Sequence, residues 1–293
     1  MRTMLENLKP TLQPYMDQTT PYSQSDYIII GAPMDLTSSY RGGTDKGPDS
    51  IRRESIYLES YSPRTGLDLE DITLCDHGDI KADNYHDWKN QIEQTVSQVS
   101  EDGKTPILLG GEHSITLGAL KALKPDLVFT FDAHMDLRDE LFDEKDSHAT
   151  FMRRAFEEQD FKLVIIGGRA FSQQELTYLD ENKDRIKLVT AQEILRGDQP
   201  NITDWLEEST RTYLTVDMDV LDPSQAPAVG NPSPEGITVT QLMNHITKIV
   251  NTKLVGFDIN EVSPTYDTGL TSINAAYLLL ETIYTIEKSK RNL

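Results

Sequence analysis

The sequence places aspartate and histidine side chains, which can bind metal ions, directly after apolar runs. The stretch TFDAHMDLRD, residues 130–139, follows the apolar run PDLVF and carries Asp132, His134 and Asp136 at alternate positions. Residues two apart on a strand share a face, so these three side chains can point into one cleft. A buried charge is costly unless it is paired. The stretch therefore predicts a charged partner for this face.

Two further segments repeat the arrangement. Asp217 and Asp219 in TVDMDV have the same spacing, and His113 follows Gly110 and Gly111 in ILLGGEHS. We expect these glycines to allow a tight turn before a helix begins. Any one aspartate is more often a helix cap or a turn residue than a ligand. The three motifs together, each at the end of an apolar run, favour a metal site.

The charges of these residues indicate which metals would fit. Asp132, Asp136, Asp217 and Asp219 would bring like charges together, which requires protonation or cations. Two divalent ions would offset the aspartates and leave the imidazoles as neutral ligands. Oxygen-rich ligation without thiolate suits Mn²⁺ better than Zn²⁺, although Co²⁺, Fe²⁺ or Ni²⁺ could use the same ligands. A water shared by two such ions forms hydroxide near neutral pH.

The surrounding pattern predicts an α/β fold, a three-layer α/β/α sandwich with a mainly parallel sheet. Strand-like apolar runs alternate with helical patterns along the chain. We expect strands within residues 26–33, 71–78, 105–111, 125–134, 162–168, 185–191, 212–220 and 252–262. We expect helices within residues 50–61, 88–99, 114–123, 152–159, 173–182, 202–210, 238–250 and 272–289. Ligands of such sheets bind beyond the carboxyl ends of the strands, where the polar motifs lie.

The chain shows no linker, so we expect one domain over residues 1–293. Residues 1–25 contain Pro10, Pro14 and Pro21 and little periodicity, which predicts an extended N-terminal arm lying on the body or on a neighbouring subunit.

The overall composition limits the kinds of partner that the protein is expected to bind. The formal net charge of −20 argues against nucleic acid or an anionic membrane and is compatible with a cationic ligand. The only cysteine, Cys75, cannot form an internal disulfide, and the N-terminus has no apolar signal segment, so we expect a cytoplasmic protein. No stretch reaches the roughly 20 apolar residues that a membrane span requires.

The motifs GGEHS, DAHMDLR, VDMDVLDPSQAP and DINEVSP resemble the signatures of the ureohydrolase family, which includes arginase and agmatinase. The resemblance covers nearly the whole chain, in the family's order, and implies an arginase-like sandwich with a binuclear manganese centre. It also implies a homo-oligomer, a trimer or a hexamer. By motif, one ion would bind His113, Asp132, Asp136 and Asp217, and the other Asp132, His134, Asp217 and Asp219, with Asp132 and Asp217 bridging.

The same resemblance assigns the catalytic roles to Asp136, Glu261 and His148. Glu261 in DINEVSP matches the glutamate that binds the guanidinium, and a carboxylate can accept two N–H groups side by side. Its alternative is a surface ion-pair residue. His148 in DSHATFMRR matches the histidine that shuttles protons to the product amine, and imidazole titrates in the right range. Its alternative is a helix cap.

The expected substrate is a small cationic guanidino compound. The resemblance favours agmatine, hydrolysed to putrescine and urea, which would place the protein in polyamine biosynthesis. An acidic stretch, Asp139, Glu140, Asp143 and Glu144, could favour this cation. Arg138, also assigned to substrate binding, could instead bind the carboxylate of 4-guanidinobutyrate, and guanidine or arginine are further alternatives.

Departures from the family pattern at Ala149, Ala228 and residues 264–272 lie near the expected pocket and bear on substrate identity. Two other classes of protein are compatible with aspartates and histidines at strand ends. A binuclear metallophosphoesterase would carry G-D-x-H-G and G-N-H-[DE] blocks, which the sequence lacks. A non-catalytic scaffold would be expected to have lost metal ligands, and all the expected ones are present.

Overall fold

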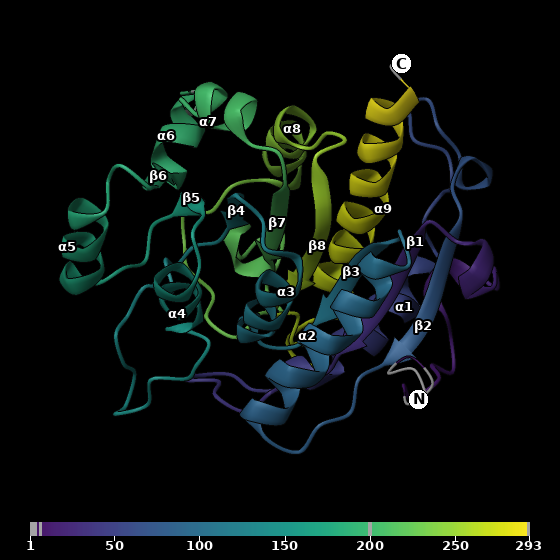
Figure 1. Ribbon diagram of the computed structural model, residues 1–293, viewed down its shortest axis with the longest axis horizontal. Coiled ribbons are helices and arrows are strands. Elements are labelled where there is room, and N and C mark those ends of the chain that lie inside the picture. Colours follow the sequence, from purple (N-terminus) through teal and green to yellow (C-terminus); the bar gives the residue numbers. More distant parts are fainter. Residues whose placement is uncertain (1–4, 6–7, 199–200, 292–293) are drawn as a thin grey trace.

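One eight-stranded sheet forms the centre of the computed structural model, which describes residue 5, residues 8–198 and residues 201–291 (Figure 1). The strand order is β2-β1-β3-β8-β7-β4-β5-β6, and every neighbouring pair is parallel. The strands are β1 (Tyr27–Ala32), β2 (Leu74–Asp79), β3 (Thr105–Gly110), β4 (Leu127–Phe131), β5 (Lys162–Gly168), β6 (Ile186–Thr190), β7 (Thr212–Asp217) and β8 (Leu254–Asn260). Each lies within one of the expected apolar runs except for the last residue of β2, and the predicted parallel sheet is confirmed.

Helices cover both faces of the sheet, because successive strand residues point to opposite sides and both sides are apolar. In β1, Ile29 packs into one buried cluster and Ile28 into the other. The first cluster is covered by α1 (Gly47–Ser55), α6 (Ala191–Arg196), α7 (Thr203–Glu208), α8 (Val239–Ile249) and α9 (Leu270–Arg291). The second is covered by α2 (Tyr85–Glu101), α3 (Thr116–Leu123), α4 (Phe151–Glu158) and α5 (Gln173–Glu181). This arrangement confirms the three-layer α/β/α sandwich.

Two helical expectations were wrong. Helix α6 was not predicted, although Thr190 and Glu193 form a capping box in which each side chain bonds to the other's main chain. Helix α1 ends at Ser55 rather than continuing to residue 61, and the chain turns there, with the Tyr57 and Leu58 N–H groups bonded three residues back. A six-residue helix offers too little periodicity to be detected, and its cap was the available signal.

The central strands β3, β8, β7 and β4 are adjacent in the sheet, so their carboxyl ends meet at one edge. Gly110 ends β3 and Gly111 follows it, where the chain bends before the 3₁₀ turn His113–Ile115 and α3, as expected; neither glycine adopts a left-handed conformation. Their role is to make room: a Cβ on Gly110 would lie 1.8 Å from Asn260 Oδ1, and one on Gly111 would lie 2.0 Å from the Met34 carbonyl oxygen. Glycine here permits close approach of neighbouring segments.

The N-terminal residues that are described lie against the sheet edge and α9. Lys9 pairs with Asp79 of β2, and the buried phenol of Tyr15 donates to the Ala276 carbonyl at 2.6 Å. Short 3₁₀ turns occur at Tyr15–Asp17 and Tyr22–Gln24. Part of the expected arm, residues 1–4 and 6–7, lies outside the described residues. Among the helices that are described, none combines the length and apolarity needed to cross a membrane.

Candidate metal centre and substrate cavity

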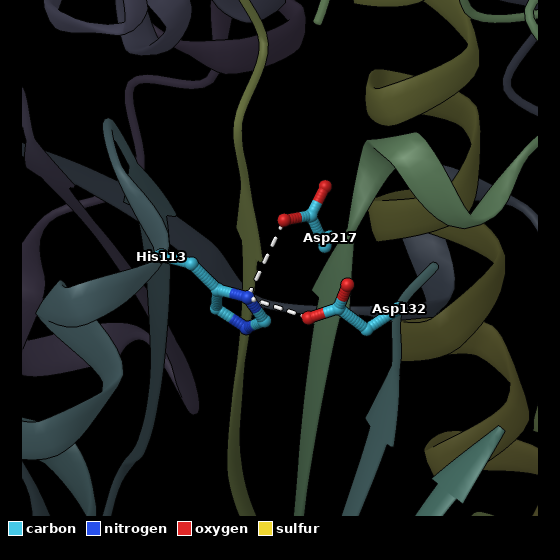
Figure 2. Close-up of side chains that lie close together, drawn as sticks. All are labelled: His113, Asp132 and Asp217. Atoms are coloured by element: carbon cyan, nitrogen blue, oxygen red, sulfur yellow. Dashed lines mark ion pairs between the residues drawn. The ribbon is translucent and has the colours of Figure 1, made fainter. Parts of the chain in front are cut away.

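His113 lies beside three carboxylates, two of which, those of Asp132 and Asp217, are drawn in Figure 2. Its Nδ1 is 3.1 Å from Asp132 Oδ2 and 3.4 Å from both Asp136 Oδ2 and Asp217 Oδ2. One ligand atom each from His113, Asp132 and Asp217 lies within 4.8 Å of the others, and all three residues are buried. Among the described residues, no group forms a hydrogen bond with this buried Nδ1. An unpartnered lone pair facing carboxylates is what a divalent cation would fill.

A chain of hydrogen bonds behind His113 sets the orientation of its ring. Its Nε2 is 2.7 Å from the Thr215 hydroxyl oxygen, and Thr215 donates in turn to buried Asp258. The Tyr213 hydroxyl also donates to Asp258, at 2.6 Å. Because the Thr215 proton goes to the carboxylate, its oxygen accepts the Nε2 proton, which leaves the Nδ1 lone pair free for an ion.

A second triad joins the first through a shared aspartate. His134 Nδ1 lies 2.9 Å from Asp219 Oδ2 and 3.6 Å from Asp132 Oδ1. Ligand atoms of Asp132, His134 and Asp219 all lie within 4.8 Å of one another. The side chain of His134 is 30% exposed, whereas that of His113 is 1% exposed. Asp217, expected to bridge both ions, belongs to the first triad and not to the second.

Three aspartates serve both the main chain and the cluster: Asp217 and Asp219 use one oxygen for each, whereas Asp132 Oδ1 faces both the His134 N–H and the His134 ring. Asp217 Oδ1 accepts the Asp219 N–H at 2.7 Å, and Asp132 Oδ1 accepts the His134 N–H at 2.6 Å. Asp219 Oδ1 accepts the Ala133 N–H at 3.1 Å. These aspartates therefore act as turn residues, the alternative role noted in the sequence, and also face the histidines.

The route by which Asp132, His134 and Asp136 converge differs from the expected strand face. Strand β4 ends at Phe131, and Asp136 adopts a left-handed conformation with φ 53°. Glu261, directly after β8, is left-handed as well, with φ 65°. Non-glycine residues in this region carry a cost that surrounding structure must offset, and such positions gather at functional sites.

Burial and neighbouring charges shift the pKa of several residues in the cluster. Burial alone would lower the pKa of His113, but Asp132, Asp136 and Asp217 raise it well above its usual value. Burial, followed by the charge of Asp132, raises the pKa of Asp136 to about 7. Burial and the neighbouring Asp219 raise the pKa of Asp217 well above its ordinary range. Without a cation, the site holds protons that a cation would displace.

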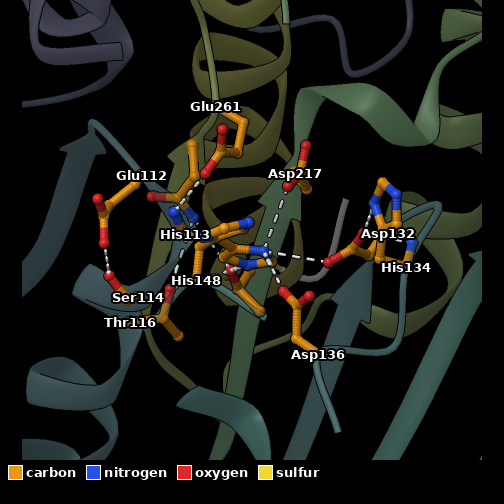
Figure 3. Close-up of polar contacts among 12 residues, drawn as sticks. Glu112, His113, Ser114, Thr116, Asp132, His134, Asp136, His148, Asp217 and Glu261 are labelled. Carbon is orange, nitrogen blue, oxygen red and sulfur yellow. Dashed lines mark hydrogen bonds and ion pairs between the residues drawn. The ribbon is translucent and has the colours of Figure 1, made fainter. Parts of the chain in front are cut away.

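Glu261 faces the same space from the end of β8 (Figure 3). Its Oε1 accepts the main-chain N–H of His113 at 2.7 Å, and a Cβ on Gly230 would lie 2.9 Å from its Oε2. Burial raises the pKa of Glu261 to about 8. Glu261 lines a cavity of about 300 Å³ together with His113, His134, Asp136, Asp217 and Asp219. It is therefore not a surface ion-pair residue.

His148 lines this cavity between two hydroxyl groups that the sequence did not point to. Its Nδ1 lies 3.2 Å from Thr37 Oγ1, and its Nε2 lies 3.2 Å from Ser39 Oγ. Thr37 is held by Glu112, whose carboxylate accepts the Thr37 hydroxyl at 2.8 Å. Burial lowers the pKa of His148. Residues 37 and 39 lie more than 100 positions away in sequence, and no local pattern marks them.

The acidic residue that lines the cavity beside Arg138 is not one of those expected from the sequence. Arg138 lines the cavity, and its Nε lies 3.7 Å from Oε2 of the buried Glu175, which lines the cavity as well. Of the segment after Arg138, Leu141 and Phe142 reach the lining. None of the expected acidic residues, Asp139, Glu140, Asp143 and Glu144, is among the lining residues, and Asp139 instead pairs with Arg154 at 2.6 Å. The acidic group here is Glu175, contributed by α5.

The three departures noted in the sequence occupy different places. Ala149 lines the cavity. Ala228 is buried and is not among the residues that line the cavity; its N–H donates to Thr271 Oγ1 at 2.9 Å. Residues 264–272 begin with a 3₁₀ turn, Pro264–Tyr266, and the Tyr266 ring lies 4.9 Å from the Arg41 guanidinium carbon.

Comparison with known proteins gives the chain its family. Residues 25–284 match the Arginase family. The chain belongs to the arginase family. It is 36% identical to the agmatinase of Bacillus subtilis over 264 residues, covering 87% of this chain and 89% of that protein. It is 34% identical to the guanidinobutyrase of Pseudomonas aeruginosa over 283 residues, covering 92% and 88%.

A solved structure resembles the whole fold. The agmatine ureohydrolase of Thermoplasma volcanium superposes with a TM-score of 0.87 at 37% identity, covering 97% of each chain. The resemblance to ureohydrolases, of which agmatinase is the most similar kind, is therefore confirmed.

Proposed function

We propose that this arginase-family protein is a binuclear-metal ureohydrolase that hydrolyses agmatine to putrescine and urea. The observation that carries the proposal is Asp132, shared by two histidine–aspartate triads that face Glu261 across one cavity. The similarity to agmatinase and agmatine ureohydrolase, over most of each chain, supports the choice of substrate.

The proposed cofactor is a pair of Mn²⁺ ions. His113, Asp132, Asp136 and Asp217 would hold one, and His134, Asp132 and Asp219 the other, with Asp217 as a further expected bridge. The unpartnered Nδ1 of His113 and the oxygen-rich, thiolate-free donor set support this assignment. Bound ions supply a water whose pKa is low enough to yield a nucleophile near neutral pH.

The residues of the chain orient the guanidinium and handle protons. Glu261 presents its carboxylate into the cavity, anchored by the His113 N–H, and a guanidinium there would keep it ionised despite burial. His148, oriented by Thr37 and Ser39, is within the same cavity and can deliver a proton to the departing amine. The Asp136 carboxylate faces His113 and can accept a proton from the attacking water.

The far end of the cavity bears on which guanidino compound is used. Arg138 would suit the carboxylate of 4-guanidinobutyrate, and a guanidinobutyrase is among the relatives. However, Arg138 lies beside the buried carboxylate of Glu175, which offsets its charge. The partly neutralised Arg138 therefore gives a distal carboxylate little advantage over the distal ammonium group of agmatine.

Assembly and location stay predictions. A cytoplasmic homo-oligomer, trimeric or hexameric, is expected from the family resemblance and from the single cysteine. No contact with nucleic acid or membrane is expected for a chain of net charge −20.

Urea release by Mn²⁺-loaded protein tests the proposal. Agmatine, 4-guanidinobutyrate, guanidine and arginine are offered separately, and the highest kcat/KM is expected for agmatine. The Glu261→Gln variant is the control for chemistry at this site and should release little urea from any of them. Faster turnover of another compound would reassign the substrate, and no urea from any would refute the activity.

A further inference from the structure

Arg169 follows β5 and holds three segments of the site together, although neither the metal motifs nor the cavity lining includes it. Its main-chain N–H donates to the Ala133 carbonyl at 2.8 Å, between Asp132 and His134. Within the part of the chain that the structure describes, its guanidinium donates to main-chain carbonyls alone, namely those of Gly167, Asp219, Val220, Leu221, Ser233 and Pro234, at 2.7–3.2 Å. Carbonyls that would otherwise repel one another thus converge on one cation.

Three of these contacts join Asp219, which lines the cavity, to the loop that carries Gly230 and Asn231. The Arg169 Nη2 to Asp219 carbonyl contact, 2.7 Å, fixes the main chain of a second-triad residue. The contacts to the carbonyls of Ser233 and Pro234, 2.9 and 3.0 Å, fix the loop that carries Gly230 against Glu261 and Asn231 against the cavity. A shift of this loop would therefore move the wall beside Glu261.

The backbone before Arg169 is shaped for this close approach. Gly167 adopts φ 99°, and a Cβ there would lie 2.4 Å from Val220 Cγ2 and 3.3 Å from the Asp132 carbonyl oxygen. The end of β5 can therefore approach both the Asp132 segment and the segment after β7, which places the guanidinium between them. Glycine is needed here for both its conformation and its size.

We propose that Arg169 is a positioning residue that couples the His134–Asp132–Asp219 triad to the substrate loop, residues 227–236. Through this coupling, the second metal position and the part of the loop beside Glu261 form together. The proposal rests on the proposed function for its kinetic consequence, but its metal consequence does not require turnover.

The geometry requires arginine rather than any cation. A guanidinium has five N–H donors in a planar fork, whereas a lysine ammonium has three donors on a compact group. Lysine can therefore reach some of these carbonyls and not all. We expect Arg169→Lys to be intermediate and Arg169→Met to lose the coupling.

The test compares Arg169→Met and Arg169→Lys with Arg211→Met in the full chain. Arg211 is the matched control because it also donates to a main-chain carbonyl, that of Leu123 at 2.7 Å, but at the opposite end of β7. Titration with Mn²⁺, followed by calorimetry and by electron paramagnetic resonance, reports the two ions directly. Changes in the hydrogen-bonded surroundings of ligands typically cost 10–100-fold in metal affinity.

In Arg169→Met, the second Mn²⁺ should bind about 10–100-fold more weakly, and the spin-coupled two-manganese signal should give way to that of isolated Mn²⁺. KM for agmatine should rise more than kcat falls once both sites are saturated. Arg169→Lys should lie between, and Arg211→Met should match the unmodified protein.

Wild-type affinity for both ions in a folded Arg169→Met protein would overturn the proposal. If that variant does not fold, Arg169→Lys decides: unchanged Mn²⁺ binding and KM would overturn it equally. A wild-type protein that binds two Mn²⁺ but releases no urea refutes the proposed function alone, because the metal readout of Arg169 still applies.

Discussion

The floor and the rim of the cavity are built in different ways. The floor, defined here as His113, Asp132, His134, Asp136, Asp217, Asp219 and Glu261, lies at or within five residues of the carboxyl ends of the four central strands and is mostly buried. The rim, defined as Arg138, Leu141, Phe142, Ala149, Glu175 and Asn231, comes from loops and α5. Phe142 is 77% exposed, in contrast to 1% for His113. We therefore expect the floor to determine the reaction and the rim the substrate.

The largest effect is expected at the residue that joins the two triads. Asp132→Asn removes a charge shared by both, so Mn²⁺ binding and kcat/KM should fall by more than the roughly 100-fold that changes outside the ligand set cost. Asp126→Asn, at the opposite end of β4, is the matched control. Metal titration and urea release measure both variants. An Asp132→Asn protein that keeps two tightly bound ions would remove the distinction between floor and rim.

The residue behind the floor should give the next largest effect. Thr215→Val keeps the shape of the side chain but removes the hydroxyl between His113 Nε2 and Asp258. We expect about 10–100-fold weaker Mn²⁺ binding. Leaving buried groups unpaired should also lower the free energy of unfolding by about 1–3 kcal/mol. Calorimetry and denaturant titration check the two effects, and unchanged metal binding would show that the ring needs no support.

The floor should also respond to pH in a defined direction. The pKa of Asp136 is raised to about 7 and that of Glu261 to about 8, so the metal-free folded protein binds protons that the unfolded chain releases at lower pH. Stability from these groups is present below about pH 4 and is lost as pH rises through 7 to 8. Bound cations would remove this loss.

The gain in melting temperature on adding Mn²⁺ should therefore grow between pH 5 and pH 8, by at least about 2 °C. Differential scanning calorimetry with and without a chelator measures it. A gain that is constant or shrinks with rising pH would contradict the proton release from this cluster.

The smallest effect is expected at the rim. Arg138→Met removes a partly exposed charge beside Glu175, so kcat/KM for agmatine relative to 4-guanidinobutyrate should rise about three- to tenfold while Mn²⁺ binding stays unchanged. Steady-state kinetics with both substrates checks it. A fall in the ratio would assign Arg138 to agmatine binding, and a loss of metal would show that rim and floor are not separable.

Most of the fold was predictable because its signals are local. Runs such as YIIIGA and LVFTF are long enough and apolar enough to indicate buried strands. Helix α6 was missed because its six residues show little periodicity. The helical pattern of residues 50–61 predicted that α1 continues beyond Ser55, but the helix ends at that residue.

The floor was predictable because its side chains sit beside strand ends that parallel topology brings together. The path of the chain into this cluster was not predictable, since Asp136 reaches it through a left-handed turn. Thr37, Ser39, Glu175 and Arg169 escaped notice because each acts on residues distant in sequence. No spacing within the sequence signals contacts that only packing creates.

X-ray diffraction from Mn²⁺-soaked crystals, recorded on both sides of the manganese absorption edge, tests the central claim most directly. We predict two anomalous peaks, one bonded to His113 Nδ1 and one to His134 Nδ1, with Asp132 contacting both. A single peak, or two ions without Asp132 between them, would contradict a binuclear centre in this cavity.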